Sequence, residues 1–317
     1  MLPFKTDVDN SFSFSFNSFS TSSKYSLEIP KDTTPNLPSL PQQGELVHFG
    51  DSSDIDFMTL SPSVWKSMVT DIGVKTLLDI GCGRGASTAW FITHTVQSLC
   101  VEGSQQAIQT TLLPDPSQHL IEHDYTLGPW WPQSTQDAVW CVDFLEHVGR
   151  HFHHNLLPTF RKSAIIFMTH AVKGGLHHVE VHPATWWIHK MQMYGFRYSE
   201  DWTQALRAIA KREGKAKIPS MMNGKTYDAQ HLYKNTGLLV FINPAVTALP
   251  EHAHLMAEHG CYQSTGKEGP LKTKHKKCGI GHGGFKETPL DKEFLAIELT
   301  PSMDKEWEIL MSKTLSN

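Results

Sequence analysis

No stretch of this sequence stays apolar for the roughly 20 consecutive residues that a membrane-spanning helix needs, so we expect a soluble protein. The sequence also lacks a strong excess of charge, because 28 Lys and Arg stand against 32 Asp and Glu for a formal net charge of −4. Such a balance gives no overall attraction to nucleic acid or to an anionic membrane. Composition therefore indicates neither as a partner, and function must be argued from individual sites.

Cysteine is scarce and is not arranged for pairing or for metal binding. The five cysteines are Cys82, Cys100, Cys141, Cys261 and Cys278, and no two of them form a CxxC motif. An odd number of scattered cysteines disfavours a disulfide framework and indicates a reducing compartment, so we expect a cytoplasmic protein. Organelle targeting is the alternative, and Asp7, Asp9 and the shortage of arginine in the first 43 residues argue against it.

Composition divides the 317 residues into three parts. Residues 1–43 are rich in Ser, Phe and Pro, without helical periodicity, which predicts a disordered leader. Residues 44–244 carry the expected folded domain, with an insertion at 203–235 that we expect to cap a substrate pocket. Residues 245–317 are rich in His, Lys and Gly in their first half and predict a C-terminal extension that is partly loop.

Short apolar runs recur through the central part, with helix-compatible stretches between most of them. The runs are 75–80, 98–101, 119–122, 137–142, 164–168, 196–198 and 237–242. Glycines follow the first run, and residues 86–94 predict a helix after them. This alternation predicts an α/β fold, a Rossmann-like seven-stranded and mainly parallel sheet with helices on both faces.

Ligands of open parallel sheets bind outside the carboxyl ends of the strands, so the residues that follow each strand are the candidate site. After the first strand, Gly81, Gly83 and Gly85 allow a tight turn and a close approach of the backbone to a ligand. Glu102 lies about 20 residues further on, the offset at which a carboxylate holds both hydroxyls of a ribose. Asp124 stands at the end of the third strand.

The glycine loop alone also fits a dinucleotide-binding fingerprint, since Ala86 takes its third position. However, Asp79 precedes Gly81 by two residues and would repel the pyrophosphate of a dinucleotide. S-adenosylmethionine instead brings an ammonium and a sulfonium, which a carboxylate attracts. Glu102 is then expected to bind the ribose and Asp124 the adenine amino group. A hydride-transfer enzyme is the alternative.

Three segments resemble the class I methyltransferase superfamily over about residues 44–244. Residues 77–85 are similar to its first motif, 101–104 to its ribose-binding acid and 143–148 to its fourth-strand motif. The resemblance implies S-adenosylmethionine as the cofactor. The residues expected to bind it are Asp79, Gly81, Cys82, Gly83, Gly85, Glu102, Gly103, Asp124, Tyr125 and Asp143.

Residues 170–172, 175–183 and 187–188 are similar to a narrower group of methyltransferases, several attributed to sugar modification. This resemblance implies O-methylation of a hydroxyl acceptor, a sugar, other glycan or small metabolite. Glu180 and His182 depart from the group, in which amide side chains are usual, and this leaves the acceptor open. A protein or lipid acceptor and a non-catalytic cofactor-binding module are the alternatives. No Asn-Pro-Pro-Tyr type motif follows the fourth strand, which disfavours methylation of a nucleic-acid base, and the sequence does not give the oligomeric state.

Position selects catalytic candidates among the 19 histidines. His170 ends the fifth strand, and His177 and His178 begin the loop after it, where an acceptor would approach the methyl group. We expect at least one of them to act as a general base or to orient the acceptor, because imidazole titrates in the required range. His147, after the fourth strand, is a further candidate. The alternative for each is helix capping or packing.

A metal site is not expected from the sequence. His178, Glu180 and His182 would share one face of an extended segment, and imidazole with carboxylate suits zinc, iron or manganese. However, Pro183 interrupts the segment and no fourth ligand is indicated. A second set lacks the close spacing of structural zinc sites. It consists of Cys261, His275, Cys278 and His282.

Overall fold

The structure, a computed structural model, describes residues 55–214, 216–217, 226–234, 237–256 and 299–312. The chain divides into two compact units, Met1–Glu45 and Leu46–Asn317, and every described residue belongs to the second. The leader predicted at 1–43 and the cysteine and histidine set at 261–282 lie outside the described residues.

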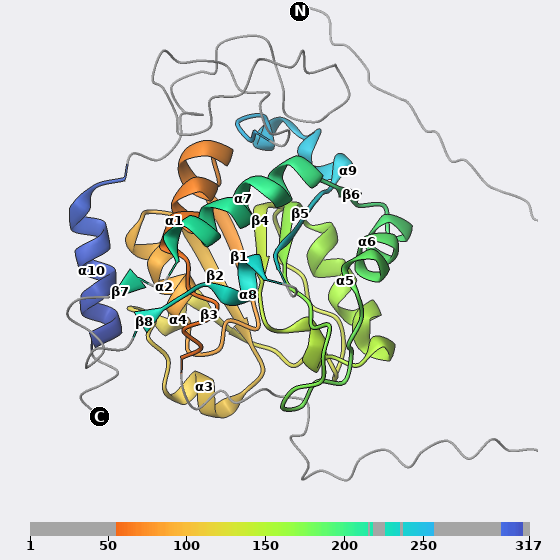
Figure 1. Cartoon of the computed structure of the whole chain (residues 1–317), viewed down its shortest axis with the longest axis horizontal. Helices are drawn as coiled ribbons and strands as arrows, with labels where there is room; N and C mark the ends of the chain where they lie inside the picture. The colour runs from red at the N-terminus through yellow and green to blue at the C-terminus, as the bar shows by residue number, and fades with distance from the viewer. Residues whose placement is uncertain (1–54, 215, 218–225, 235–236, 257–298, 313–317) are drawn as a thin grey trace, which may run out of the picture. The chain divides into compact units, whose positions relative to one another are not determined.

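A seven-stranded sheet forms the centre of the described unit (Figure 1). Its strand order is β3-β2-β1-β4-β5-β9-β6, in which β1 to β5 run parallel while β9 is antiparallel to both of its neighbours. The strands are β1 (Thr76–Ile80), β2 (Gln97–Glu102), β3 (Leu120–Glu122), β4 (Gln136–Cys141), β5 (Ser163–Met168), β6 (Arg197–Tyr198) and β9 (Leu239–Ile242). Each overlaps one of the predicted runs, so the predicted sheet is confirmed.

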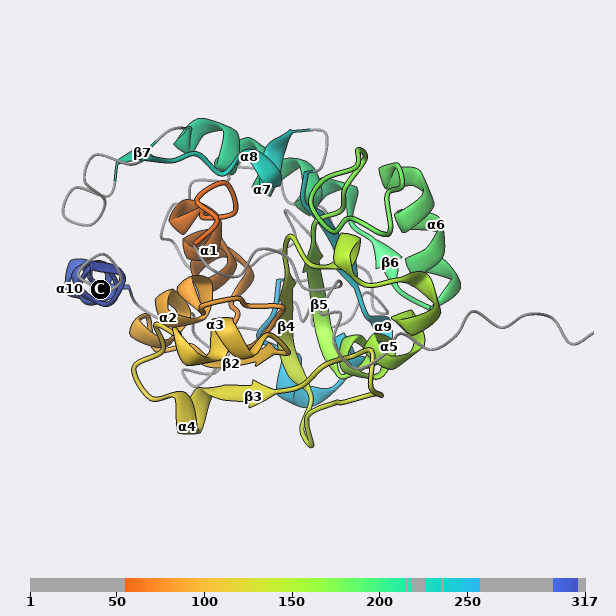
Figure 2. The ribbon, with the colours of Figure 1, turned by 90° about the horizontal axis from the view of Figure 1, so that it is seen from below.

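Helices cover both faces of this sheet, as predicted (Figures 1 and 2). The longer ones are α1 (Pro62–Ser67), which continues into a π-helical turn, α2 (Ala86–Thr93), α5 (His153–Arg161), α6 (Ala184–Met193), α7 (Glu200–Glu213) and α10 (Pro301–Ser312). Short helices are α3 (Gln105–Gln109), α4 (Pro116–His119), α8 (Gln230–Tyr233) and α9 (Pro244–Thr247). A two-stranded ribbon, β7 (Ala216–Lys217) with β8 (Thr226–Tyr227), lies outside the main sheet.

Two hydrophobic cores follow from the alternation of side chains along the strands. Leu77 of β1 packs on one face in a core with Trp65, Trp90 and Trp202 from α1, α2 and α7. Leu78, the next residue, packs on the other face, in the core to which α5 and α6 contribute. Since β1 is buried on both faces, three of its five residues are apolar, namely Leu77, Leu78 and Ile80.

Helix α10 was not predicted, because residues 245–317 were expected to be partly loop. Trp307 of this helix is 3% exposed, and its Nε1–H donates a 2.9 Å hydrogen bond to the carbonyl oxygen of Ala86. The contact joins α10 to α2, directly after the glycine loop. Across the residues that the structure describes, no helix combines the length and apolar character needed to cross a membrane.

Candidate active site

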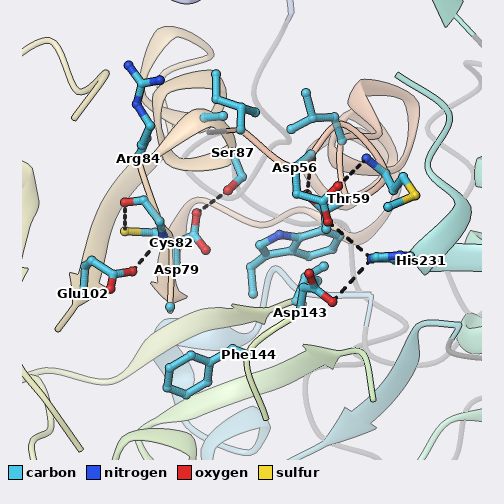
Figure 3. A pocket seen from close by; sticks show the side chains of 18 of the residues that line it. Asp56, Thr59, Asp79, Cys82, Arg84, Ser87, Glu102, Asp143, Phe144 and His231 are labelled. Atoms are coloured by element: carbon cyan, nitrogen blue, oxygen red, sulfur yellow. Dashed lines mark hydrogen bonds and ion pairs between the residues drawn. The ribbon is translucent and has the colours of Figure 1, made fainter. Parts of the chain in front are cut away.

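A cavity of about 370 Å³ opens at the carboxyl ends of β1 and β4 (Figure 3). Its wall is formed by the β1–α2 loop, the end of β2, the segment after β4, residues 55–60, α8, and Leu176 and His178 from the loop after β5. Of the residues expected to bind the cofactor, Asp79, Gly81, Cys82, Gly83, Glu102 and Asp143 line it. Gly85, Gly103, Asp124 and Tyr125 belong to neighbouring segments and are not in its lining.

Two glycines of the β1–α2 loop meet different requirements. Gly81 has φ +68°, and a Cβ built there would lie 2.1 Å from the ring of Phe144, so a side chain has no room. Gly83 has φ +55°, and a Cβ there would meet nothing within 4 Å. Positive φ disfavours other residues at both positions, but the space beside Gly83 belongs to the cavity. The backbone at Gly83 is therefore open to a ligand.

Glu102 ends β2 and links three backbone N–H groups. Its Oε2 accepts a 2.8 Å hydrogen bond from the N–H of Gly83, while Oε1 accepts from Gly103 at 3.0 Å and from Ser104 at 2.8 Å. Burial raises the pKa of Glu102, and these hydrogen bonds oppose the rise. The carboxylate is thus fixed against the glycine loop, with its remaining acceptor capacity available to hydroxyl groups.

Asp79 is 2% exposed and lies at the end of β1. Its Oδ2 accepts hydrogen bonds of 2.5 Å from Ser87 Oγ and 2.6 Å from Thr88 Oγ1, both in α2. Burial nevertheless raises the pKa of Asp79 to about 6. A carboxylate of this kind gains from a cationic ligand group beside it, because that group offsets the cost of burying the charge.

Cys82 and Cys100 are joined by a disulfide, with their Cα atoms 5.6 Å apart. The sequence did not predict this bond. The parallel register of β1 and β2 pairs Asp79 with Cys100, which brings the loop after β1 next to β2. A separation of 18 residues in the chain gives no sign of this approach.

Asp143 follows β4 and is positioned by an unusual backbone conformation. Its φ is +56°, and its N–H donates a 2.8 Å hydrogen bond to Thr169 Oγ1 after β5. Its Oδ1 lies 3.3 Å from Nδ1 of His231, which also lies 3.4 Å from Oδ2 of Asp56 (Figure 3). A non-glycine residue with positive φ is strained, and such strain gathers at functional sites.

Neighbouring charges shift the pKa values of His231 and Glu146 in this part of the cavity. Burial alone would lower the pKa of His231, but its contacts with Asp143 and Asp56 raise it to about 10. Burial and the nearby charge of Asp143 raise the pKa of Glu146.

The sequence analysis did not single out Asp56 or His231. Among the described residues, the side chains that together could hold a metal ion are Asp56, Asp143 and His231, with one ligand atom of each within 4.8 Å of the others.

The four predicted catalytic histidines separate into two pairs. His147 and His178 line the cavity, and their rings are nearly perpendicular with centroids 5.0 Å apart. His147 Nδ1–H donates to the carbonyl oxygen of His177 at 3.2 Å, and burial lowers the pKa of His147. His177 itself does not line the cavity. His170 is 0% exposed, and burial followed by the charge of Arg207 lowers its pKa to about 4.

Glu180 and His182 belong to a different cluster from His178. Glu180 Oε1 accepts from the backbone N–H of Arg150 at 2.8 Å and from its Nε–H at 3.0 Å. Glu180 Oε2 lies 2.7 Å from His182 Nε2, and the His182 ring stacks on Trp186 with centroids 3.8 Å apart. The shared strand face considered for these three side chains therefore does not form. Glu180 instead anchors Arg150, just after the segment that holds Asp143 and Glu146.

Part of this chain is similar to a known protein family. Residues 78–162 match the family described as a methyltransferase domain. No curated protein matches the chain significantly. The matched segment runs from β1 through the glycine loop and Glu102 to the end of α5.

Solved methyltransferase structures match part of the chain at low identity. A magnesium protoporphyrin IX methyltransferase from Synechocystis with bound S-adenosylmethionine is 12% identical, with 57% of this chain and 74% of that chain covered and a TM-score of 0.36. A TehB-like S-adenosylmethionine-dependent methyltransferase from Corynebacterium glutamicum is also 12% identical, covering 60% and 89%, with a TM-score of 0.36. One from Archaeoglobus fulgidus is 17% identical, covering 54% and 86%, with a TM-score of 0.32. The glycine loop and Glu102 both lie within the segment that is similar to a methyltransferase domain.

Proposed function

We propose that this protein transfers a methyl group from S-adenosylmethionine to a hydroxyl group of a sugar or another small metabolite. The observation that carries the proposal is the pairing of the glycine loop with Glu102 beside buried Asp79 in one cavity. The cavity volume of about 370 Å³ lies within the range of about 300–1,000 Å³ usual for small-molecule sites.

The residues of this cavity match the chemistry of the cofactor. Asp79 is placed to attract the ammonium of S-adenosylmethionine, whose positive charge would favour the ionised carboxylate. Glu102 is placed to accept from the ribose hydroxyls, and the open backbone at Gly83 leaves room beside it. Asp124 remains the expected adenine ligand. It lies outside the cavity lining, and its Oδ1 accepts from the N–H of Thr126 at 2.8 Å.

His147, His178 and Asp143 form the acceptor end of the cavity. In the proposed reaction the acceptor oxygen forms a bond to the methyl carbon as the carbon–sulfur bond breaks. The hydroxyl proton is lost, and the sulfur departs as S-adenosylhomocysteine. Burial lowers the pKa of His147, so its imidazole is neutral near pH 7 and able to take this proton. Alignment of the two reactants provides the rest of the acceleration.

The proposal is tested with S-adenosylmethionine carrying a radiolabelled methyl group and a panel of hydroxyl acceptors that includes sugars. We expect label in at least one acceptor and an equal amount of S-adenosylhomocysteine. The matched control is Gly83→Asp, which should transfer no label because a side chain enters the cofactor space. Cofactor binding without transfer to sugars, small metabolites, lipids or proteins would favour a non-catalytic binding module. Label in a protein or lipid alone would replace the acceptor and keep the reaction.

A further inference from the structure

We propose that Asp56, Asp143 and His231 bind a divalent metal ion at the acceptor end of the cavity, beside the buried carboxyl group of Glu146. Binding of the ion depends only on these side chains and not on the proposed reaction. Its role in catalysis rests on the proposed methyl transfer, which the metal would assist by binding the acceptor hydroxyl.

The distances between the three side chains suit a single ion. Nδ1 of His231 lies 3.4 Å from Oδ2 of Asp56 and 3.3 Å from Oδ1 of Asp143. Two ligand atoms that each lie about 2.1 Å from a shared ion are at most about 4.2 Å apart. Both measured separations fit this limit, and the whole group falls within 4.8 Å. Imidazole with carboxylates suits manganese, zinc or iron better than calcium.

Three separate segments hold these ligands in place. The N–H of His231 donates to the carbonyl oxygen of Met58 at 3.1 Å, which fixes α8 against the segment that carries Asp56. The N–H of Asp143 donates to Thr169, which fixes the third ligand between β4 and β5. The ligands are therefore arranged by backbone contacts that do not depend on the His231 ion pairs.

Glu146 lies beside this group. Its side chain is 2% exposed, and its Oε2 has no hydrogen-bond partner. It lines a second cavity, of about 260 Å³, together with Asp143 and His231. A buried carboxyl oxygen without a partner is costly, and a cation bound at Asp143 would reduce this cost.

The competing explanation is a set of ion pairs between His231 and the carboxylates of Asp56 and Asp143, which requires no metal.

The position between two cavities defines what the ion would do. Asp143, His178 and His231 line both the cofactor cavity and the second cavity, so an ion here would lie between the cofactor space and the space where an acceptor enters. A metal ion lowers the pKa of a bound hydroxyl. The hydroxyl proton would pass to the imidazole of His147 before or during attack, and the oxygen would bond to the methyl carbon as the carbon–sulfur bond breaks.

The test measures metal binding directly, without activity. Purified full-length protein is stripped with a chelator, titrated with Mn²⁺ and followed by the loss of the free-ion electron paramagnetic resonance signal, with Zn²⁺ as competitor. We expect one tight site in the wild type and at least a tenfold loss of Mn²⁺ affinity in Asp56→Asn and in His231→Gln.

Matched controls are Glu306→Gln and His189→Gln, which remove a carboxylate or an imidazole from exposed positions. Both should keep wild-type Mn²⁺ affinity. Equal Mn²⁺ affinity in the wild type, Asp56→Asn and His231→Gln would overturn the metal site, as would no binding at all. Calorimetry of the metal-stripped wild type with S-adenosylhomocysteine separates the two proposals, because it measures cofactor binding independently of Mn²⁺. Mn²⁺ binding without any binding of S-adenosylhomocysteine would overturn the methyltransferase and keep the metal site.

Discussion

The backbone N–H of Gly83 donates a 2.8 Å hydrogen bond to Oε2 of Glu102. This bond connects the loop after β1 to the end of β2, the two elements that a nucleoside ligand of such a fold must contact together. A second bond, from Ser104 to the other oxygen, fixes the carboxylate orientation. The cofactor side of the cavity is therefore organised before any ligand arrives, which favours tight binding.

Substitution of Gly83 should abolish cofactor binding. Gly83→Asp places a side chain and a negative charge in the open space of the cavity, and we expect no measurable heat with S-adenosylhomocysteine. Gly195→Asp is the matched control, because Gly195 also has positive φ and open space around a built Cβ but lies after α6. Equal binding in Gly83→Asp and the wild type would contradict the assigned site.

Cofactor affinity should depend on pH through Asp79. Burial raises its pKa to about 6, so the carboxylate is ionised above this pH and neutral below it. Only the ionised form attracts an ammonium group. Affinity for S-adenosylhomocysteine should therefore fall as pH drops from about 7.5 to about 5, by up to roughly tenfold per unit below the pKa. Asp79→Asn should bind weakly with a flatter profile, and an unchanged profile would remove Asp79 from the binding site.

Loss of the cavity histidines should affect turnover and not cofactor binding. We expect His147→Ala or His178→Ala to lower kcat at least tenfold, as for loss of a general base, with affinity for S-adenosylhomocysteine within a few fold. His177→Ala serves as the comparison, because His177 does not line the cavity. Full turnover in both cavity variants would confine these histidines to packing and leave Asp143 with His231 as the acceptor-side groups.

A buried charge cluster at the opposite end of β4 should control stability. Asp137 accepts from His252 Nδ1 at 2.7 Å, from His254 Nε2 at 3.0 Å and from the N–H of Lys75 at 2.8 Å. Burial opposes ionisation, but these partners lower the pKa of Asp137 to about 2. Asp137→Asn should cost about 3–5 kcal/mol, or a fall in Tm of roughly 6–20 °C.

The pH dependence of this cluster follows from the same shift. Because the pKa of Asp137 is lowered in the folded state, its carboxylate stabilises the folded protein at pH values above the unfolded pKa of 3.8. This stabilisation is lost as the pH falls toward about 2. Thermal melts of the wild type, Asp137→Asn and the exposed control Glu306→Gln at several pH values measure it. A variant as stable as the wild type near pH 7 would show that the cluster contributes nothing.

The sequence was sufficient to predict the sheet and much of the cofactor cavity, because both depend on local patterns. Buried strands are short apolar runs, and the turn after β1 needs glycine wherever φ is positive. Glu102 followed from its fixed offset after the loop. The glycine loop and Glu102 belong to one strand–helix–strand unit, residues 76–102, and the offset between them is a property of that unit.

The acceptor side could not be predicted in the same way, because its residues come from distant parts of the chain. Asp56, Asp143 and His231 meet only through tertiary packing, and no motif surrounds the first or the last. Trp307 reaches Ala86 across 221 residues. Side chains of an extended segment point alternately to opposite sides, and this rule could have been applied to residues 169–171. Thr169 and Ala171 line the second cavity, whereas His170 between them does not.

The central claim is that the cavity at β1 and β4 binds S-adenosylmethionine. Isothermal titration calorimetry of the wild-type protein with S-adenosylhomocysteine, and separately with NAD, measures this most directly. We predict one site of micromolar-scale affinity for S-adenosylhomocysteine, lost in Gly83→Asp, and no heat with NAD. Binding of NAD in place of S-adenosylhomocysteine would contradict the account and restore the hydride-transfer alternative.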